Sequence, residues 1–216
     1  MHMAQREHDD SDETTVDDPI LDAFLSDSRY DRIRVERFSH FKQPIPRKLA
    51  VQCALLGSLV LLVPLYALYP QSTAEYLPTL DPVVASPKVL FLGAFGVAVE
   101  LATATLLVAA ALYRVRNDPL SEEQAATVFD VENFATYLGF GTGGVTIALT
   151  LGFFLLGVGG ESALGWYVTT MEGANPFAAT GTSFSVGHLA TVALSGALAV
   201  LVARAYVASE LAALDG

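Results

Sequence analysis

The chain contains four long apolar segments separated by polar stretches. They cover residues 49–69, 88–113, 137–158 and 184–207, and charged residues are nearly absent from them. An α-helix rises about 1.5 Å per residue, so about 20 residues cross a hydrocarbon core of about 30 Å. The pattern therefore predicts an all-α membrane protein with four transmembrane helices in an up-down bundle.

Basic residues gather on one side of this predicted bundle. Ten of the twelve are Arg29, Arg32, Arg34, Arg37, Lys42, Arg47, Lys48, Arg114, Arg116 and Arg204. Lys88 borders a loop on the other side, and Arg6 lies far out in the N-terminal tail. This asymmetry follows the positive-inside rule, and it predicts a multi-pass protein of the cell membrane with both termini in the cytoplasm.

Two further parts precede the transmembrane domain, which we expect over residues 49–216. Residues 1–18 carry seven acidic residues and little apolar surface, so we expect a disordered tail. The helix-start pair Asp18-Pro19 marks the beginning of residues 19–48. Within this segment, arginines alternate with apolar residues at helical spacing. This pattern favours an amphipathic segment on the inner leaflet, and a solvated charged linker is the alternative. The expected contacts to lipid headgroups are Arg29, Arg32, Arg34, Arg37, Arg47 and Lys48.

The composition combines an apolar chain with an acidic surface. Hydrophobic residues make up 52% of the sequence, yet the formal net charge is −11. Acid-rich, lysine-poor surfaces are typical of extreme halophiles, where salt screens self-repulsion, and this favours a halophilic archaeon as the source. The single cysteine, Cys53, excludes an intramolecular disulfide.

The connecting segments contain helix signals. Ser121 and Gln124 form a capping-box pattern, so a helix should start at Glu122 and run toward the third span. Pro44 and Pro46 should break the helix just before the first span. A short helix is expected around residues 162–171, on the outer side.

Glu100 is the most unusual residue within the spans, because it places a carboxyl near the centre of the second one. An ionised carboxyl there costs about 2.5–3.5 kcal/mol on insertion scales, so it normally faces the bundle interior or a wet cavity. Gly93, Gly96 and Thr103 share its helix face at spacings of three and four residues. We therefore expect this face to be interior and the carboxyl to be protonated.

The third and fourth spans carry similar stripes of small and polar residues. The expected positions of close helix packing are Gly93, Gly96, Gly139 and Gly143. The expected intramembrane polar cluster is Glu100, Thr103, Thr146, Thr150, Thr191 and Ser195. His188 lies at the outer end of the stripe in the fourth span. The first span offers nothing comparable beyond Gly57 and Ser58.

Two interpretations of this cluster stay open. In the first, a protonated Glu100 donates to a hydroxyl across helices, and the chain is a non-catalytic membrane subunit or scaffold. In the second, Glu100 is the centre of a proton- or ion-coupled transporter or channel component. Polar side chains lead outward through His188 and Thr191, whereas Leu107 and Ala110 look dry toward the cytoplasm. This one-sided pattern favours the first interpretation.

Several classes of function have no support in the sequence. It contains no HExxH, paired-cysteine, phosphate-loop or nucleophile-elbow pattern, so we expect neither an enzyme nor a bound metal or cofactor. His188 is the one histidine within a predicted span, which argues against a bis-histidine haem. The expected partners are the lipid bilayer and a protein or second copy in the membrane, and no nucleic acid.

Overall fold

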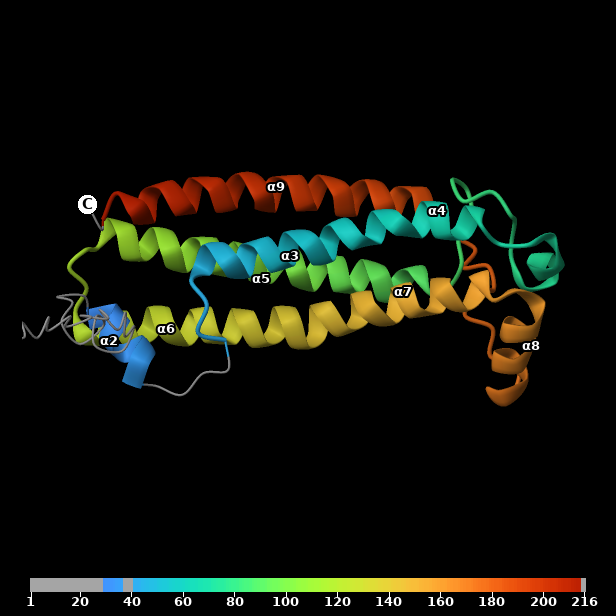
Figure 1. Cartoon of the computed structure of the whole chain (residues 1–216), viewed down its shortest axis with the longest axis horizontal. Helices are drawn as coiled ribbons and strands as arrows, with labels where there is room; N and C mark the ends of the chain where they lie inside the picture. The colour runs from blue at the N-terminus through green and yellow to red at the C-terminus, as the bar shows by residue number, and fades with distance from the viewer. Residues whose placement is uncertain (1–28, 37–40, 215–216) are drawn as a thin grey trace, which may run out of the picture.

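The regular structure of the chain is helical (Figure 1). The computed structural model describes residues 29–36 and 41–214, and this part of the chain contains no β-strand. In chain order the elements are α2 (Arg29–Glu36), α3 (Ile45–Ser58), the 3-10 turn η1 (Leu59–Leu61), α4 (Leu62–Ala67), the 3-10 turn η2 (Gln71–Tyr76), α5 (Leu90–Arg116), α6 (Glu122–Tyr137), the π-helical η3 (Leu138–Gly144), α7 (Val145–Val158), α8 (Gly160–Thr170) and α9 (Val186–Ala212). The predicted tail 1–18, the residue Arg37 and the side chain of Arg34 lie outside the description.

Four helical stretches of the described chain are long and apolar enough to cross a membrane. They are Ile45–Ala67, Leu90–Arg116, Glu122–Val158 and Val186–Ala212. The predicted all-helical class and the number of long apolar helices are confirmed. The boundaries differ most in the third stretch.

This third stretch begins at Glu122 and runs without interruption for 37 residues through α6, η3 and α7. The predicted capping box at its start is confirmed: Ser121 Oγ accepts from the Gln124 backbone at 3.2 Å, and Gln124 Oε1 accepts from the Ser121 backbone at 2.9 Å. A helix of this length measures about 55 Å. It therefore extends well beyond a hydrocarbon core of about 30 Å.

The first stretch begins earlier than predicted, at Ile45. The expected break at Pro46 is wrong, because this proline lies in the first turn of α3, where its missing N–H has no helical partner to lose. Pro44 is the N-cap residue in extended conformation. The two prolines therefore start the helix and fix its direction.

The connections lie at two opposite ends of the bundle (Figure 1). The segments 68–89 and 159–185, with η2 and α8, form one end, and α8 confirms the short helix predicted there. Backbone hydrogen bonds join these two segments, among them Lys88 N to Ala178 O at 3.0 Å. The helix α2, the connection 117–121 and the last turns of α9 lie at the other end.

The core is built around α5, which packs against α3, α6, η3, α7 and α9. Near the end that carries α8, four buried aromatic side chains contact one another with ring centroids 4.7 to 6.5 Å apart. They are Tyr66, Tyr69, Phe154 and Phe177. A smaller apolar cluster at the opposite end joins α2 to α5 and α6 through Tyr30, Ala110, Leu120, Ala125, Val128 and Phe129.

Close helix contacts occur where the sequence places glycines on α5. A Cβ added at Gly96 would lie 2.8 Å from Thr146 Oγ1, and one at Gly93 would lie 2.8 Å from Leu189 Cδ2. Neither position has room for a side chain without movement of a neighbour. These glycines let α7 and α9 approach α5 directly.

Candidate functional site

Glu100 lies inside the bundle. Its residue is 0% exposed in the middle of α5, and so is Gln52 on α3. The surface that faces the carboxyl is the backbone of η3, where a Cβ at Gly143 would lie 2.8 Å from Glu100 Oε1 and 3.1 Å from its Cδ. The glycine therefore provides the space that the carboxyl occupies.

Gln52 and Thr103 form a hydrogen bond beside this carboxyl. Gln52 Nε2 donates to Thr103 Oγ1 at 2.8 Å, and the threonine hydroxyl donates to the Val99 carbonyl at 2.9 Å. A Cβ at Gly139 would lie 2.8 Å from Thr103 Oγ1 and 2.9 Å from Gln52 Nε2. The amide, the hydroxyl and the glycine thus belong to one tight contact between α3, α5 and η3.

Three buried oxygen atoms in this contact lack a donor. Within the described residues, Glu100 Oε1, Glu100 Oε2 and Gln52 Oε1 have no hydrogen-bond partner. An unpaired buried polar atom costs about 1–3 kcal/mol, and a charged one costs more. A proton or another hydrogen-bond donor at these oxygen atoms would therefore remove part of this cost.

The helix opposite Glu100 is wound more loosely than an α-helix. Residues Leu138–Gly144, with the sequence LGFGTGG, form the π-helical segment η3. Such segments are rare, occur mostly as single turns and are frequent at functional sites. Gly139 and Gly143 face α5, whereas Gly141 has open space beside it. The π-turn and the buried carboxyl therefore lie at the same level of the bundle.

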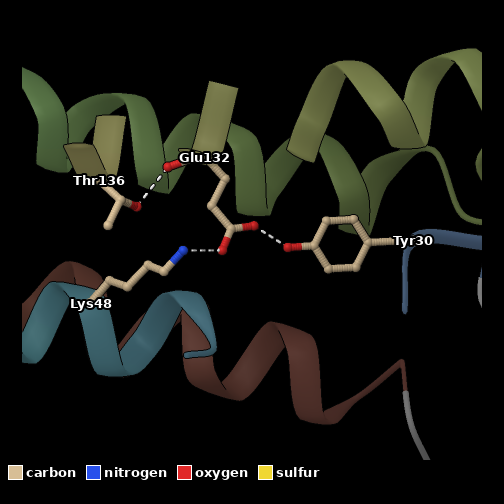
Figure 2. A network of polar contacts seen from close by, with 4 residues as sticks. All are labelled: Tyr30, Lys48, Glu132 and Thr136. Atoms are coloured by element: carbon tan, nitrogen blue, oxygen red, sulfur yellow. Dashed lines mark hydrogen bonds and ion pairs between the residues drawn. The ribbon is translucent and has the colours of Figure 1, made fainter. Parts of the chain in front are cut away.

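A second polar network lies closer to α2 (Figure 2). Lys48 Nζ pairs with Glu132 Oε1 at 2.7 Å, and both side chains are nearly inaccessible, at 3% and 5% exposure. Tyr30 on α2 donates its hydroxyl to the other carboxylate oxygen of Glu132. The Thr136 hydroxyl donates to the Glu132 backbone carbonyl at 2.6 Å. Each oxygen of the buried carboxylate thus has a donor, which a buried ion pair requires.

The two networks are neighbours along the same helices. Lys48 and Gln52 are one turn apart on α3, about 6 Å along the axis. Glu132, Thr136 and Gly139 follow one another at spacings of four and three residues on the third span. We call the buried polar residues of both networks the polar seam: Tyr30, Lys48, Glu132, Thr136, Gln52, Thr103 and Glu100.

Thr146 and Thr150 pack against Gly96 and Gly93 of α5 and form no described hydrogen bond to Glu100. Thr146 donates to the carbonyls of Thr142 and Gly143, and Thr150 donates to the carbonyl of Thr146 at 2.8 Å. Thr150 is fully buried. Both hydroxyls are satisfied within their own helix, so they support packing against α5 and offer no donor to the carboxyl.

The structure does not bring Thr191 and Ser195 into the cluster. Both are exposed on α9, and their hydroxyls donate to carbonyls four residues earlier in the same helix, at 2.8 and 2.9 Å. The buried face of α9 is formed by Leu189, Ala193, Gly196, Ala197 and Val200. Hydroxyls satisfied in this way can face lipid, so a polar stripe does not identify the interior face.

His188 is also exposed on α9, in the first turn of this helix. Its Nδ1 lies 2.8 Å from Ser185 Oγ in a second capping box, where Ser185 Oγ also accepts from the His188 backbone. The histidine therefore helps to start the helix and has no contact with Glu100.

Lys48 was predicted to contact lipid headgroups, and the structure contradicts this. It is buried in the ion pair with Glu132, because a cation at the end of a span can turn toward the bundle interior when a carboxylate lies on the facing helix. Arg47, its neighbour, is exposed. Arg29 and Arg32 are exposed as well, and Arg29 Nη1 donates to the Leu120 carbonyl at 2.9 Å.

Sequence reasoning missed Gln52 and Glu132. Gln52 lies in the span where no polar partner was expected, one turn after Lys48. Glu132 lies in the helix that was predicted to start at Glu122, on the face that also carries Thr136. A usable signal was present: a cation and an amide four residues apart in one span, and a carboxylate and a threonine four residues apart in another.

Comparison with known protein families, with curated proteins and with solved structures finds no match for this chain. The function is therefore inferred from the geometry of the polar seam and from the distribution of charge along the bundle.

Proposed function

We propose that the chain is a proton-coupled component of a membrane transport system, in which Glu100 takes up and releases a proton through the polar seam. The observation that carries this proposal is the group of three buried acceptor oxygens on Glu100 and Gln52 without a donor. A proton on the carboxyl would remove the cost of a buried charge and would give Glu100 a hydrogen-bond donor of its own.

The proposed topology is an up-down bundle with both termini in the cytoplasm. The described cations Arg29, Arg114, Arg116 and Arg204 belong to the end with α2, and Lys88 belongs to the opposite end. The positive-inside rule assigns the first end to the cytoplasm. Lys48 and Glu132 then lie on the cytoplasmic side of Glu100.

Depth along α5 supports a site within the hydrocarbon core. Glu100 follows Leu90, the first residue of α5, by ten residues. This corresponds to about 15 Å, which is half the thickness of the core. A carboxylate at this depth has a strong preference for the protonated form or for a nearby cation.

The seam is the proposed route for protons on the cytoplasmic side. From Glu100 the route passes the hydrogen-bonded pair Gln52 and Thr103 and continues one turn along α3 to the Lys48–Glu132 pair. Its direction differs from the outward pattern of polar residues expected from the sequence, because its residues come from α3 and α6. Toward the outer side, the buried cluster of Tyr66, Tyr69, Phe154 and Phe177 closes the bundle.

The elements that pack around Glu100 carry few other ionisable groups that could take up the proton. The helices η3 and α7 have no ionisable side chain in their sequences, and Cys53 on α3 donates its thiol to the Ala197 carbonyl. The ionisable residues of α9, His188, Arg204, Tyr206 and Glu210, lie near its two ends. Lys48 and Glu132 are therefore the nearest charged groups along the seam, and they neutralise each other.

A second candidate function is the non-catalytic subunit expected from the sequence. It is favoured by the outer aromatic cluster, because the described route reaches only one surface. In that case a permanently protonated Glu100 would serve helix packing alone.

Infrared difference spectroscopy of the full-length protein in nanodiscs distinguishes the two candidates. Proton exchange predicts that a protonated carboxyl band appears in acid and is lost in alkali, and that Glu100→Gln removes this change. Glu123→Gln, on the exposed first turn of α6, is the matched control and should leave the band unchanged. A spectrum without a pH-dependent band that depends on Glu100 would refute proton exchange and favour the packing role.

A further inference from the structure

A basic pocket lies at the cytoplasmic end, apart from the Glu100 site. It has a volume of about 250 Å³ and lies between α2, the last turns of α5 and the connection 117–121. Arg29 and Arg32 from α2 line it together with Arg114 from α5. Three guanidinium groups thus surround one space, two of them from α2 and the third from a residue more than 80 positions later in the chain.

Two of these arginines are held in place by neighbours. Arg29 Nη1 donates to the Leu120 carbonyl at 2.9 Å. The guanidinium carbon of Arg114 lies 4.3 Å from the centre of the Tyr30 ring, a cation–π distance. A guanidinium has five N–H donors, so the hydrogen bond from Arg29 to the Leu120 carbonyl leaves that arginine further donors for a ligand. Partly fixed side chains lose less conformational entropy when a ligand binds.

The charge of the pocket favours an anion. Among the described residues that line it, three arginines and one carboxylate, Asp118, give a formal charge of +2. The Asp118 carboxylate repels an anionic ligand, so its replacement by a neutral residue should strengthen the binding of that ligand. Arginine forks match the oxygen geometry of phosphate with two parallel hydrogen bonds each.

The depth of the pocket matches the headgroup region of the inner leaflet. Arg114 lies 24 residues after Leu90 on α5, which is about 36 Å along the helix. The hydrocarbon core is about 30 Å thick, and the headgroups begin beyond it. Basic pockets at this level bind anionic lipid headgroups in other membrane proteins.

We propose that this pocket binds the phosphate group of an anionic lipid of the inner leaflet. Arg32 and Arg114 contact the phosphate oxygens, and Arg29 holds the 117–121 connection in position through Leu120. The inference is independent of proton exchange at Glu100.

Native mass spectrometry of the full chain, released from detergent micelles with added lipid, tests the site. The probes are phosphatidylglycerol, phosphatidylcholine as a lipid without net charge, and inorganic phosphate. We expect one saturable phosphatidylglycerol adduct. Arg114→Gln should weaken it about tenfold or more, because a charge-assisted hydrogen bond contributes about 1.5–3 kcal/mol. Arg32→Gln is a second variant with the same expectation, for which no described contact within the fold is lost.

The matched control is Arg116→Gln, two residues along the same helix and outside the pocket lining. It should bind as the parent does, and Asp118→Asn should bind more tightly. Equal binding of phosphatidylcholine, or equal losses in the Arg114 and Arg116 variants, would overturn the site. Displacement of the lipid by inorganic phosphate at comparable concentration would assign the pocket to soluble phosphate and overturn the lipid as its ligand.

Discussion

Replacement of Lys48 by methionine should destabilise the protein strongly. The methionine keeps most of the volume of the lysine stem but leaves the Glu132 carboxylate buried with Tyr30 as the remaining described side-chain donor. Both partners of the pair are at most 5% exposed, so water cannot compensate. Removal of one partner of a buried pair typically costs about 3–5 kcal/mol. We expect a loss in this range for Lys48→Met.

Removal of both charges should restore much of this stability. In Lys48→Met/Glu132→Leu no charge remains buried, and a well-packed apolar pair is often as stable as the ion pair it replaces. The Tyr30 hydroxyl then loses its acceptor, so the addition of Tyr30→Phe should recover about 1 kcal/mol more.

Unfolding of the purified protein by titrated denaturing detergent measures these free energies. The control is Arg204→Gln, since Arg204 is an exposed cation at the same end that donates to the Pro46 carbonyl at 3.1 Å. It should cost less than about 1 kcal/mol. A Lys48→Met loss as small as that of the control, or a double variant whose loss is the sum of the single losses, would refute the reasoning.

Three further predictions concern packing, the buried carboxyl and topology. Gly143→Ala should cost about 1–3 kcal/mol in the same unfolding assay, because the new Cβ would lie 2.8 Å from Glu100 Oε1, whereas Gly141→Ala has open space and should cost no more than a few tenths of a kcal/mol. Glu100→Gln should unfold within about 1 kcal/mol of the parent, since the amide supplies a donor to its buried neighbours, and Glu100→Leu should cost more; equal losses would show that no such bond forms. In a background without the native cysteine, a cysteine at Ser162 should react with an impermeant thiol reagent in intact cells and one at Glu123 should not, and the reverse pattern would overturn the cytoplasmic assignment.

Features that depend on local pattern could be predicted from the sequence. Length and apolarity identified the four long helices, and the Ser121–Gln124 pair identified the start of α6. The face of α5 with Glu100 was also recognised, because glycines at helical spacing have few other uses in a span.

Features that depend on a partner helix could not be predicted. The choice of the buried face of α9 is decided by Ala193, Gly196 and Ala197, whose small side chains pack closely, whereas Ser195 is satisfied by its own helix. Lys48 faces inward because Glu132, 84 residues later, lies opposite it. The spacing within each segment indicates a polar face, but neither segment alone shows which faces meet in the assembled bundle.

The π-turn at Leu138–Gly144 sets the angular phase of the helix that continues beyond it. If this turn keeps its π-helical winding, deletion of a single residue within it rotates all of α7, because one residue of a helix accounts for about 100° of rotation. Gly157 meets the ring of Tyr69, and such a rotation would replace it there with a larger side chain. In this glycine-rich stretch, which resembles a tolerant linker, residue number is therefore constrained as well as residue type.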